Sequence, residues 1–212
     1  MSEIGELKSD KSFTNSFNGN NDLNYGREIG NEALSWELSS AKPGHGMNEI
    51  RDNNFNTFWQ SDGSAPHKCI IIFNKKELLS YICIYSDYKL DESYTPNHII
   101  IKALTSIYEN DIIINTELTE PNGWIKFKLK PHNRQNKYDK YLKTNKIIIE
   151  IHSSHQQGRD THVRQIKIYS PILNRINVKN NKYLIQLIND ANNISSNNDI
   201  NNNNNKSIKM SN

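Results

Sequence analysis

Three histidines lie close together in a segment that also holds a potential ion pair. The histidines are His152, His155 and His162, and Arg159 and Asp160 lie between the last two. Histidine clusters can bind metal ions, but the spacing H-x2-H-x6-H is not a recurring zinc pattern and no cysteine lies nearby. The segment is open to three interpretations: a metal site, a structural loop with internal pairing, and a surface that binds a peptide.

The same segment is rich in side chains that form hydrogen bonds. A short polar peptide is recognised by amides, hydroxyls and a few charges, each bond contributing about 0.5–1.5 kcal/mol, or up to about 3 kcal/mol with a charge. The candidate peptide-binding residues of this loop are Gln156, Gln157, Arg159, Asp160, Thr161 and His162.

A second polar segment, SDYKLDESYTP at 86–96, has the same character. The adjacent carboxylates Asp91 and Glu92 suggest a catalytic pair, but neighbouring side chains of an extended chain point to opposite faces. The segment is therefore either a solvated turn ended by Pro96 or a contact surface. Its candidate contact residues are Tyr88, Asp91, Glu92, Ser93 and Tyr94, and the turn SDGSAPH adds Asp62 and Ser64.

No set of residues typical of an active site is visible. The serines lie in turns without a G-x-S-x-G motif, and no glycine-rich phosphate loop precedes a helix. Cys69 and Cys83 lack the spacing of a zinc site, and both lie in apolar runs, which predicts two buried thiols. We therefore predict no catalytic residue, no metal and no cofactor.

The composition limits the class of protein. The net charge of +3 is too weakly basic to favour nucleic acid or a membrane as a partner. The polar N-terminus lacks the apolar core of a secretory signal, and no apolar run approaches the roughly 18–20 residues that span a bilayer. These features predict a soluble intracellular protein.

The dominant pattern between residues 31 and 171 is that of β-strands. In WIKFKLK, the apolar residues Ile125, Phe127 and Leu129 alternate with lysines, so one face is apolar. Seven strands are predicted, at 68–73, 78–85, 97–104, 111–118, 124–130, 146–152 and 163–170. No long helical pattern separates them, which disfavours parallel units and favours an antiparallel β-sandwich or jelly roll.

Two smaller features complete the structural expectations. A short helix is predicted over MNEIRDNNF, at 47–55, ahead of the first strand. Trp36, Trp59 and Trp124 are predicted to pack in the core or at its rim.

Composition also divides the chain. Residues 1–26 are predicted to be a disordered leader and 27–171 the folded domain. Residues 172–191 form a linker or a docking helix, because Tyr183, Leu184, Leu187 and Ile188 have helical spacing. Residues 192–212 are an Asn-rich tail, which is predicted to be disordered.

Four segments carry a more specific resemblance: 31–67 with FWQSDGSAPH, 85–103 with DYKLDESYTP, 119–127, and 152–171 with HQQGRDTHVRQIKIY. Together they resemble the DOC domain of subunit 10 of the anaphase-promoting complex, over nearly all of 27–171. The resemblance implies an all-β jelly-roll sandwich of the galactose-binding-domain-like type, flanked by the predicted disordered tails.

The resemblance also implies a function. The family acts in the cell cycle as a non-catalytic subunit of a ubiquitin ligase and as a co-receptor for degradation motifs (the D-box), beside an activator subunit. The expected partners are that activator, the cullin scaffold, a tetratricopeptide-repeat subunit and the degradation-motif peptides of substrates. The expected location is the nucleus and cytoplasm, and the candidate residues above are assigned to the substrate peptide.

Two observations qualify the resemblance. A wider superfamily pattern, Asp52 with Thr57-Phe58-Trp59 and Ser61, also fits a carbohydrate- or lipid-binding discoidin-like module, which is kept as the alternative. Members of the family usually end in an Ile-Arg-type dipeptide that docks on a repeat subunit. Here the nearest equivalent, Ile208-Lys209, is followed by three residues, so its docking role is in doubt.

Overall fold

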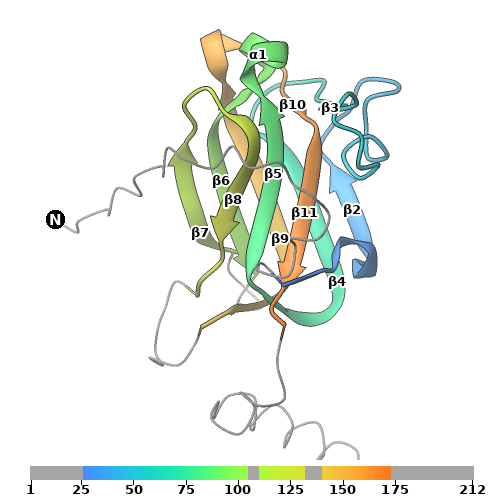
Figure 1. The fold of residues 1–212 in the computed structure, drawn as a ribbon, viewed down its shortest axis with the longest axis vertical. Helices are drawn as coiled ribbons and strands as arrows, with labels where there is room; N and C mark the ends of the chain where they lie inside the picture. The colour runs from blue at the N-terminus through green and yellow to red at the C-terminus, as the bar shows by residue number, and fades with distance from the viewer. Residues whose placement is uncertain (1–25, 105–109, 132–139, 173–212) are drawn as a thin grey trace, which may run out of the picture.

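The computed structural model describes residues 26–104, 110–131 and 140–172 (Figure 1). The predicted leader, apart from Gly26, and all of the predicted linker and tail from residue 173 onward lie outside this part. Within the described residues, no helix has the length and apolar character needed to span a membrane.

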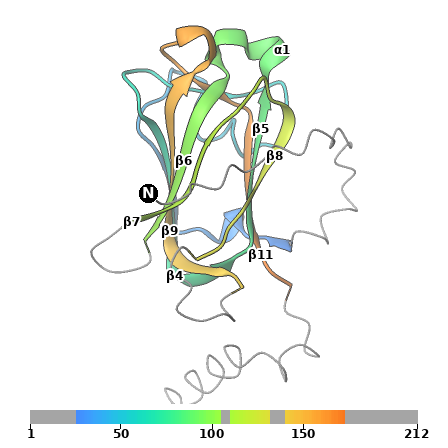
Figure 2. The same ribbon diagram turned by 90° about the vertical axis from the view of Figure 1, so that its left-hand side faces the viewer.

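Two antiparallel sheets face each other, as the edge view in Figure 2 shows. The larger sheet has the order β2-β4-β9-β6-β7. Its strands are β2 (Ser35–Leu38), β4 (His67–Leu79), β9 (Leu142–Ser154), β6 (Pro96–Leu104) and β7 (Asn110–Glu117). The predicted antiparallel sandwich is confirmed, since every paired strand in the described residues runs antiparallel to its neighbour.

The smaller sheet has the order β1-β11-β5-β8. Its strands are β1 (Arg27–Glu28), β11 (Gln165–Ser170), β5 (Tyr81–Asp87) and β8 (Asn122–Lys128). A two-stranded ribbon pairs β10 (His162–Val163) with β3 (Trp59–Gln60). The helical turns are η2 (Gly30–Glu32), α1 (Tyr88–Asp91), η3 (Glu92–Tyr94) and η4 (His155–Gln157).

Alternation of side chains builds the core between the sheets. In β4, Cys69, Ile71 and Phe73 are buried while the residues between them are less so. They meet the buried isoleucines of β9, where Ile71 pairs with Ile147 and Cys69 with Ile149. Each of the seven predicted strands has a counterpart, because this two-residue period is what a half-buried sheet imposes on its sequence. Two boundaries differ: β4 runs on to Leu79 and β5 begins only at Tyr81, and the strand predicted over 163–170 is interrupted at Arg164 between β10 and β11.

The predictions for Trp36, Trp59 and both cysteines are also confirmed, whereas Trp124 is partly buried outside the core cluster, against the rings of Tyr85 and Phe55. Trp59 is fully buried and its indole N–H donates to the carbonyl of Ser40 at 2.8 Å. Trp36 is partly buried and packs against the core. Both cysteines are buried free thiols, and burial raises the pKa of Cys69 to about 12.

The helix predicted over 47–55 is wrong, because this segment forms turns. Its Asp and Asn side chains bond to nearby backbone: the amide of Asn54 donates to Asp52 at 2.8 Å, and the amide of Asn56 donates to Asn54 at 3.0 Å. Such local bonds compete with helix formation. Gln165 of β11 also stabilises this turn, since its side-chain Nε2 donates to Asp52 Oδ1 at 2.6 Å.

Candidate functional site

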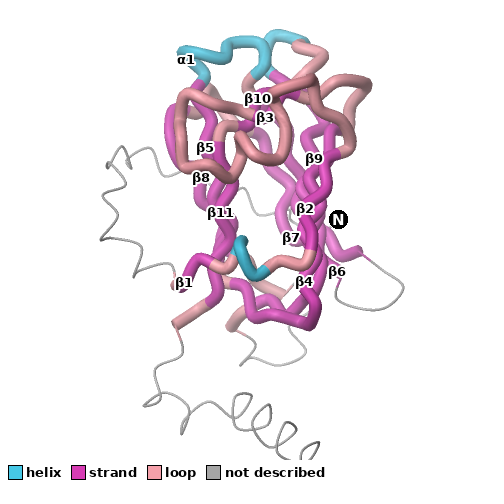
Figure 3. The backbone as a smooth tube through the Cα atoms, turned by 90° about the vertical axis from the view of Figure 1, so that its right-hand side faces the viewer, coloured by secondary structure: helices cyan, strands magenta, loops and turns pink. Residues whose placement is uncertain are grey.

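One end of the sandwich gathers the polar segments that the sequence singled out. Figures 1 and 3 place α1, η3, η4, β3 and β10 at this end, above the two sheets. We call residues 88–94 and 155–162 the rim. The rim joins two segments far apart in sequence, and η3 and η4 lie in contact there.

A buried ion network holds the rim together. Asp91, at the end of α1, accepts hydrogen bonds from Arg164 Nε and Nη2 at 2.8 and 2.7 Å. It also accepts a bond from His162 Nδ1 at 3.0 Å. The side chains of Asp91 and Arg164 are only 3% and 6% exposed, so a bidentate pair of this kind fixes α1 onto the chain between β10 and β11.

This environment keeps Asp91 charged. Desolvation by burial alone would raise its pKa, but the hydrogen bonds from His162 and Arg164 outweigh that effect and lower the pKa below its ordinary value. Asp87 adds a second anchor, since its carboxylate caps α1 by accepting from the amides of Lys89 and Leu90.

A column of four stacked rings supports the rim from below. His45 stacks on Phe58 at 4.7 Å, Phe58 on His162 at 4.0 Å, and His162 on Tyr94 at 4.3 Å between ring centroids. The Arg164 guanidinium lies 5.5 Å from the centre of the Phe58 ring. Tyr94 is the outermost ring and remains 39% exposed, so the column ends in an aromatic face that a ligand can reach.

Backbone contacts fix the two rim segments against each other. A side chain at Gly158 would overlap the carbonyl oxygen of Ser93, so only glycine allows this approach. The Nε2 atom of His155 accepts a hydrogen bond from the backbone amide of Glu120 at 3.2 Å. The ring proton of His155 therefore lies on Nδ1, which donates to the carbonyl of Thr95 at 3.0 Å.

Unusual backbone conformations concentrate at the rim. Five non-glycine residues in the described part have positive φ, and three of them lie here: Glu92, Gln156 and Gln157, with φ of 46°, 50° and 61°. Such conformations are uncommon for residues with a side chain and cluster at functional sites. The packing described above holds these side chains at the edge of the rim.

The turn after β3 borders the rim. The amide of Thr161 donates to Ser61 Oγ at 2.9 Å, and the amide of Ser61 donates to the carbonyl of Thr161 at 3.1 Å. Lys42 Nζ forms an ion pair with Asp160 Oδ2 at 3.1 Å. The hydrogen bond and charge of Asp160, with smaller contributions from Asp62 and Tyr94, raise the pKa of Lys42.

The predicted peptide-binding residues fall into three groups. The exposed ones are Glu92, Tyr94, Gln156, Gln157, Arg159, Asp62 and Ser64. The half-buried ones are Tyr88, Ser93 and Asp160. Asp91, Thr161 and His162 are buried, so their side chains support the rim instead of facing a ligand. Asp91 and Glu92 do point to opposite sides, but from a helical turn and not from an extended chain.

The three histidines of the sequence motif do not form one site. His152 lies on the outer face of the larger sheet, where it bonds to Glu150 at 2.9 Å, whereas His155 and His162 take separate places in the rim. Among the described residues, no group of three or more His, Cys, Asp or Glu side chains could hold a metal ion.

The sequence reading missed several residues that build the site. The sequence leaves open whether Arg164 is a sheet-face charge or a partner contact, and in the structure it is the buried partner of Asp91. His45, Phe58 and Lys42 were not singled out as rim residues. The one available signal was Arg164 itself, a charged residue inside the predicted strand 163–170.

Solved structures share this fold. The family 32 CBM of NanJ from C. perfringens, in complex with galactose, superposes with a TM-score of 0.54 at 14% identity, covering 66% of this chain and 96% of that module. The CBM32-1 and CBM32-2 domains of Clostridium perfringens ZmpB, in complex with GalNAc, give a TM-score of 0.58 at 13% identity, covering 74% of this chain and 38% of that one. These likenesses confirm the predicted galactose-binding-type jelly roll.

Sequence relatives are much closer. Anaphase-promoting complex subunit 10 of Homo sapiens is 47% identical over 146 residues, covering 69% of this chain and 76% of the human protein. The Dictyostelium discoideum subunit is 51% identical over 142 residues (67% and 72%), and that of Schizosaccharomyces pombe is 42% identical over 144 residues (68% and 74%). The family model for anaphase-promoting complex subunit 10 matches residues 8–192. The chain therefore belongs to the family of anaphase-promoting complex subunit 10.

Proposed function

We propose that this subunit of the anaphase-promoting complex holds the degradation motifs of substrates at the rim, as a non-catalytic co-receptor beside an activator subunit of the ubiquitin ligase. The observation that carries the proposal is the rim itself. Amide, charged and aromatic side chains are exposed there on a backbone that the Asp91–Arg164–His162 network fixes from beneath.

The chemistry of the rim suits a short polar peptide. Gln156, Gln157 and Arg159 offer donors and acceptors to a ligand, and Tyr94 offers a flat ring face. Because the backbone is fixed before binding, little conformational entropy is lost. Each bond still contributes only about 0.5–1.5 kcal/mol, so the rim alone binds weakly.

Weak binding fits a shared receptor. A peptide that already contacts an activator subunit meets the rim at a high effective concentration, so contacts that are weak alone lengthen its stay on the complex. The proposal includes the activator, the cullin scaffold and the repeat subunit as partners, and the nucleus and cytoplasm as the location.

A non-catalytic role is supported by the state of the thiols. A cysteine that carries ubiquitin must expose a reactive thiolate. Cys69 is buried in the core and its pKa is raised to about 12, and Cys83 is fully buried as well.

The test is affinity purification of the tagged subunit from mitotic cells, followed by mass spectrometry. A triple variant replaces the exposed rim residues Gln156, Gln157 and Arg159 with Ala, and a matched control replaces three exposed lysines at the opposite end, Lys75, Lys130 and Lys140. We expect the rim variant to assemble but to lose substrates, and the control to keep both. Retention of substrates by the rim variant would refute the peptide site.

A second candidate is carbohydrate binding. It is favoured by the two CBM neighbours, which are in complex with galactose and GalNAc. It is also favoured by the exposed ring of Tyr94 at the rim, because sugars stack on aromatic faces. A glycan array probed with the full-length chain separates the two functions. Strong, Tyr94-dependent sugar binding would favour the carbohydrate module over the peptide receptor.

A further inference from the structure

Each of the four longer strands of the larger sheet carries three consecutive isoleucines. The runs are 70–72 in β4, 99–101 in β6, 112–114 in β7 and 147–149 in β9. An antiparallel sheet with one wet face alternates apolar and polar residues, as β8 does, whereas unbroken apolar runs are typical of strands covered on both faces. The larger sheet therefore has the sequence of a sheet with two covered faces.

The domain itself covers one of these faces. Ile71 of β4, Ile101 of β6 and Ile149 of β9 belong to the core cluster between the sheets. The isoleucines that point to the other side lie outside that cluster, and we call them the isoleucine face: Ile70, Ile72, Ile100, Ile112 and Ile148. In Figures 2 and 3, no described helix or strand lies over this side of the larger sheet.

The strand register joins these side chains into one surface. Ile70 pairs with Ile148, Ile148 with Lys102, and Lys102 with Ile112, so a single row crosses four strands. Within the isoleucine face, Ile148 is 8% exposed, Ile112 is 46% exposed, and the other three are half-buried. The isoleucine face is thus a contiguous apolar surface that a partner can reach.

A buried ion cluster lies within the isoleucine face. The side chain of Glu150 is only 6% exposed and pairs with Lys102 Nζ at 2.8 Å and Lys68 Nζ at 3.4 Å. His152 Nε2 lies 2.9 Å from the same carboxylate. Burial alone would raise the pKa of Glu150, but the hydrogen bonds from Lys102 and His152 outweigh burial and lower it. One ionised carboxylate therefore balances only one of the two lysines.

Basic charge remains in surplus around the isoleucines. Lys146 lies opposite Ile72 in the register, and Glu37 lies opposite Ile70. In the rows of the sheet that hold the isoleucine face, three lysines thus stand against two glutamates, one of which is the buried Glu150. Such a surface complements one that combines aliphatic side chains with carboxylates. A second copy of the chain would instead bring lysines against lysines.

The size of the isoleucine face also limits the kind of partner. Five strands about 4.8 Å apart and five residues at about 3.4 Å each give an area of roughly 20 by 17 Å, or about 350 Å². A stable pairwise interface buries about 800 Å² on each partner, so this face alone would not hold a homodimer together. It suits the apolar centre of one contact among several, as in the complex to whose family this chain belongs.

We propose that the isoleucine face docks on an aliphatic surface of another subunit of the anaphase-promoting complex, which presents carboxylates to Lys68, Lys102 and Lys146. The isoleucine face covers the side of the larger sheet, whereas the rim lies at the end of the sandwich (Figure 2). The subunit therefore keeps its rim open while it is docked. The docking surface rests on membership of the family and is independent of the function proposed for the rim.

Carbene footprinting tests the docking surface. A photolysed diazirine reagent labels accessible aliphatic side chains, and peptide mapping assigns the labels. The full-length chain is labelled alone, alone at an about tenfold higher concentration, and within the purified complex. Labelling of the isoleucine face should fall at least about fivefold in the complex only. In the same complex, carbodiimide coupling should join Lys68, Lys102 or Lys146 to carboxylates of a neighbouring subunit.

Three results of the footprinting would overturn the proposal. Protection in the free chain at the lower concentration would mean that the chain covers the face itself. Protection that appears only at the higher concentration would mean a second copy. Equal labelling in the free chain and in the complex would mean that nothing docks there.

Variants test the same surface by assembly. Ile70→Thr/Ile100→Thr keeps β-branched side chains but removes apolar area, and Lys146→Glu reverses a charge. Both should lower recovery of the other subunits at least about fivefold, while substrate capture per assembled subunit stays normal. Ile172→Thr is the control, because Ile172 is 48% exposed and follows β11 of the smaller sheet.

Urea midpoints of the isolated variants show whether they fold. If the double variant is destabilised, Lys146→Glu decides. Normal recovery of the other subunits by the folded variants would overturn the docking surface, whereas loss of substrates without loss of assembly would concern only the rim.

Discussion

Replacing Asp91 by Ala removes the carboxylate at the centre of the buried network beneath the rim. The side chain of Arg164 is only 6% exposed and donates to Asp91 at 2.8 and 2.7 Å. Its remaining partners are the carbonyl of Phe55, at 2.5 Å, and the face of the Phe58 ring. The substitution therefore leaves a buried cation without a counter-charge, and His162 Nδ1 without its acceptor.

The cost follows from that geometry. Removing one member of a buried ion pair costs about 3–5 kcal/mol, since the charge left behind is neither solvated nor paired. With an m-value of about 2 kcal/mol per M for a domain of this size, the urea midpoint should fall by about 1.5–2.5 M. A domain has only about 5–15 kcal/mol of stability in total, so a loss of this size is large.

Urea unfolding at pH 7, followed by tryptophan fluorescence, measures the effect. Glu92→Ala is the matched control, because Glu92 is adjacent in sequence but exposed, and a surface change of this kind costs within about 0.5 kcal/mol. The double variant Asp91→Leu/Arg164→Met removes both charges and should recover part of the loss. If Asp91→Ala lowered the urea midpoint no more than Glu92→Ala does, the network would not be what fixes the rim.

Three further predictions follow from the same contacts. First, the stability difference between wild type and Asp91→Ala should shrink in acid. The pKa of Asp91 is 3.8 in the unfolded chain and lower in the folded protein, so its contribution to stability is complete above pH 3.8 and is lost as the pH falls through the folded pKa. Urea midpoints measured from pH 7 down to pH 3 test this, and a constant difference would contradict it. Second, Gly158→Ala should separate η4 from η3, since the new methyl group overlaps the Ser93 carbonyl, and substrate capture should drop. Gly46→Ala serves as the control, because its new methyl group meets its nearest neighbour, the side chain of Ala41, at an ordinary contact distance of 3.6 Å; intact capture by Gly158→Ala would count against the close approach. Third, Asp87→Ala removes the cap of α1 and should cost about 1 kcal/mol in the same urea assay; a cost near zero would mean that α1 does not depend on its cap.

The strands were predictable because burial of one sheet face leaves a period of two in the sequence. The seven predicted strands are long enough to show it, for example at the end of β8 and just after it, where the buried Phe127 and Leu129 alternate with the exposed Lys128 and Lys130. The strands β1, β3 and β10 have two residues each and β2 has four. Segments this short carry no recognisable period, so their pairing emerges only from the tertiary structure.

The buried network was not predictable from local pattern. Asp91 and Arg164 lie 73 residues apart, and each looks like an ordinary surface charge in its own segment. The ring column has the same origin, since His45, Phe58, Tyr94 and His162 come from four separate stretches of chain. The resemblance to a family singled out the loops as candidates for the site, whereas the structure separates the side chains that face outward from those that support them.

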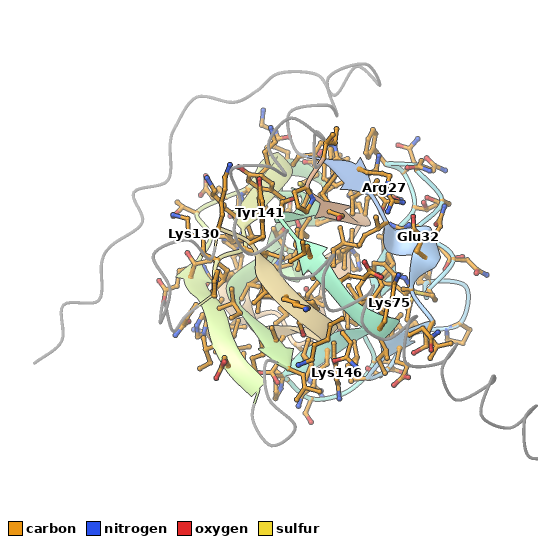
Figure 4. The ribbon with its side chains drawn as sticks, turned by 90° about the horizontal axis from the view of Figure 1, so that it is seen from below. Arg27, Glu32, Lys75, Lys130, Tyr141 and Lys146 are labelled. Carbon is orange, nitrogen blue, oxygen red and sulfur yellow. The ribbon has the colours of Figure 1, made fainter. Side chains whose placement is uncertain are left out.

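The central claim, that the rim holds the degradation motif, is tested most directly by site-specific photo-crosslinking within the complex. A photoreactive amino acid at Gln157 places the probe on the rim, and one at Lys130 places it at the opposite end of the sandwich, which Figure 4 shows from below. In the presence of the activator, a degradation-motif peptide should crosslink from position 157 and not from position 130, and a scrambled peptide should crosslink from neither. Absence of a crosslink at 157, or equal crosslinking from both positions, would contradict a peptide site at the rim.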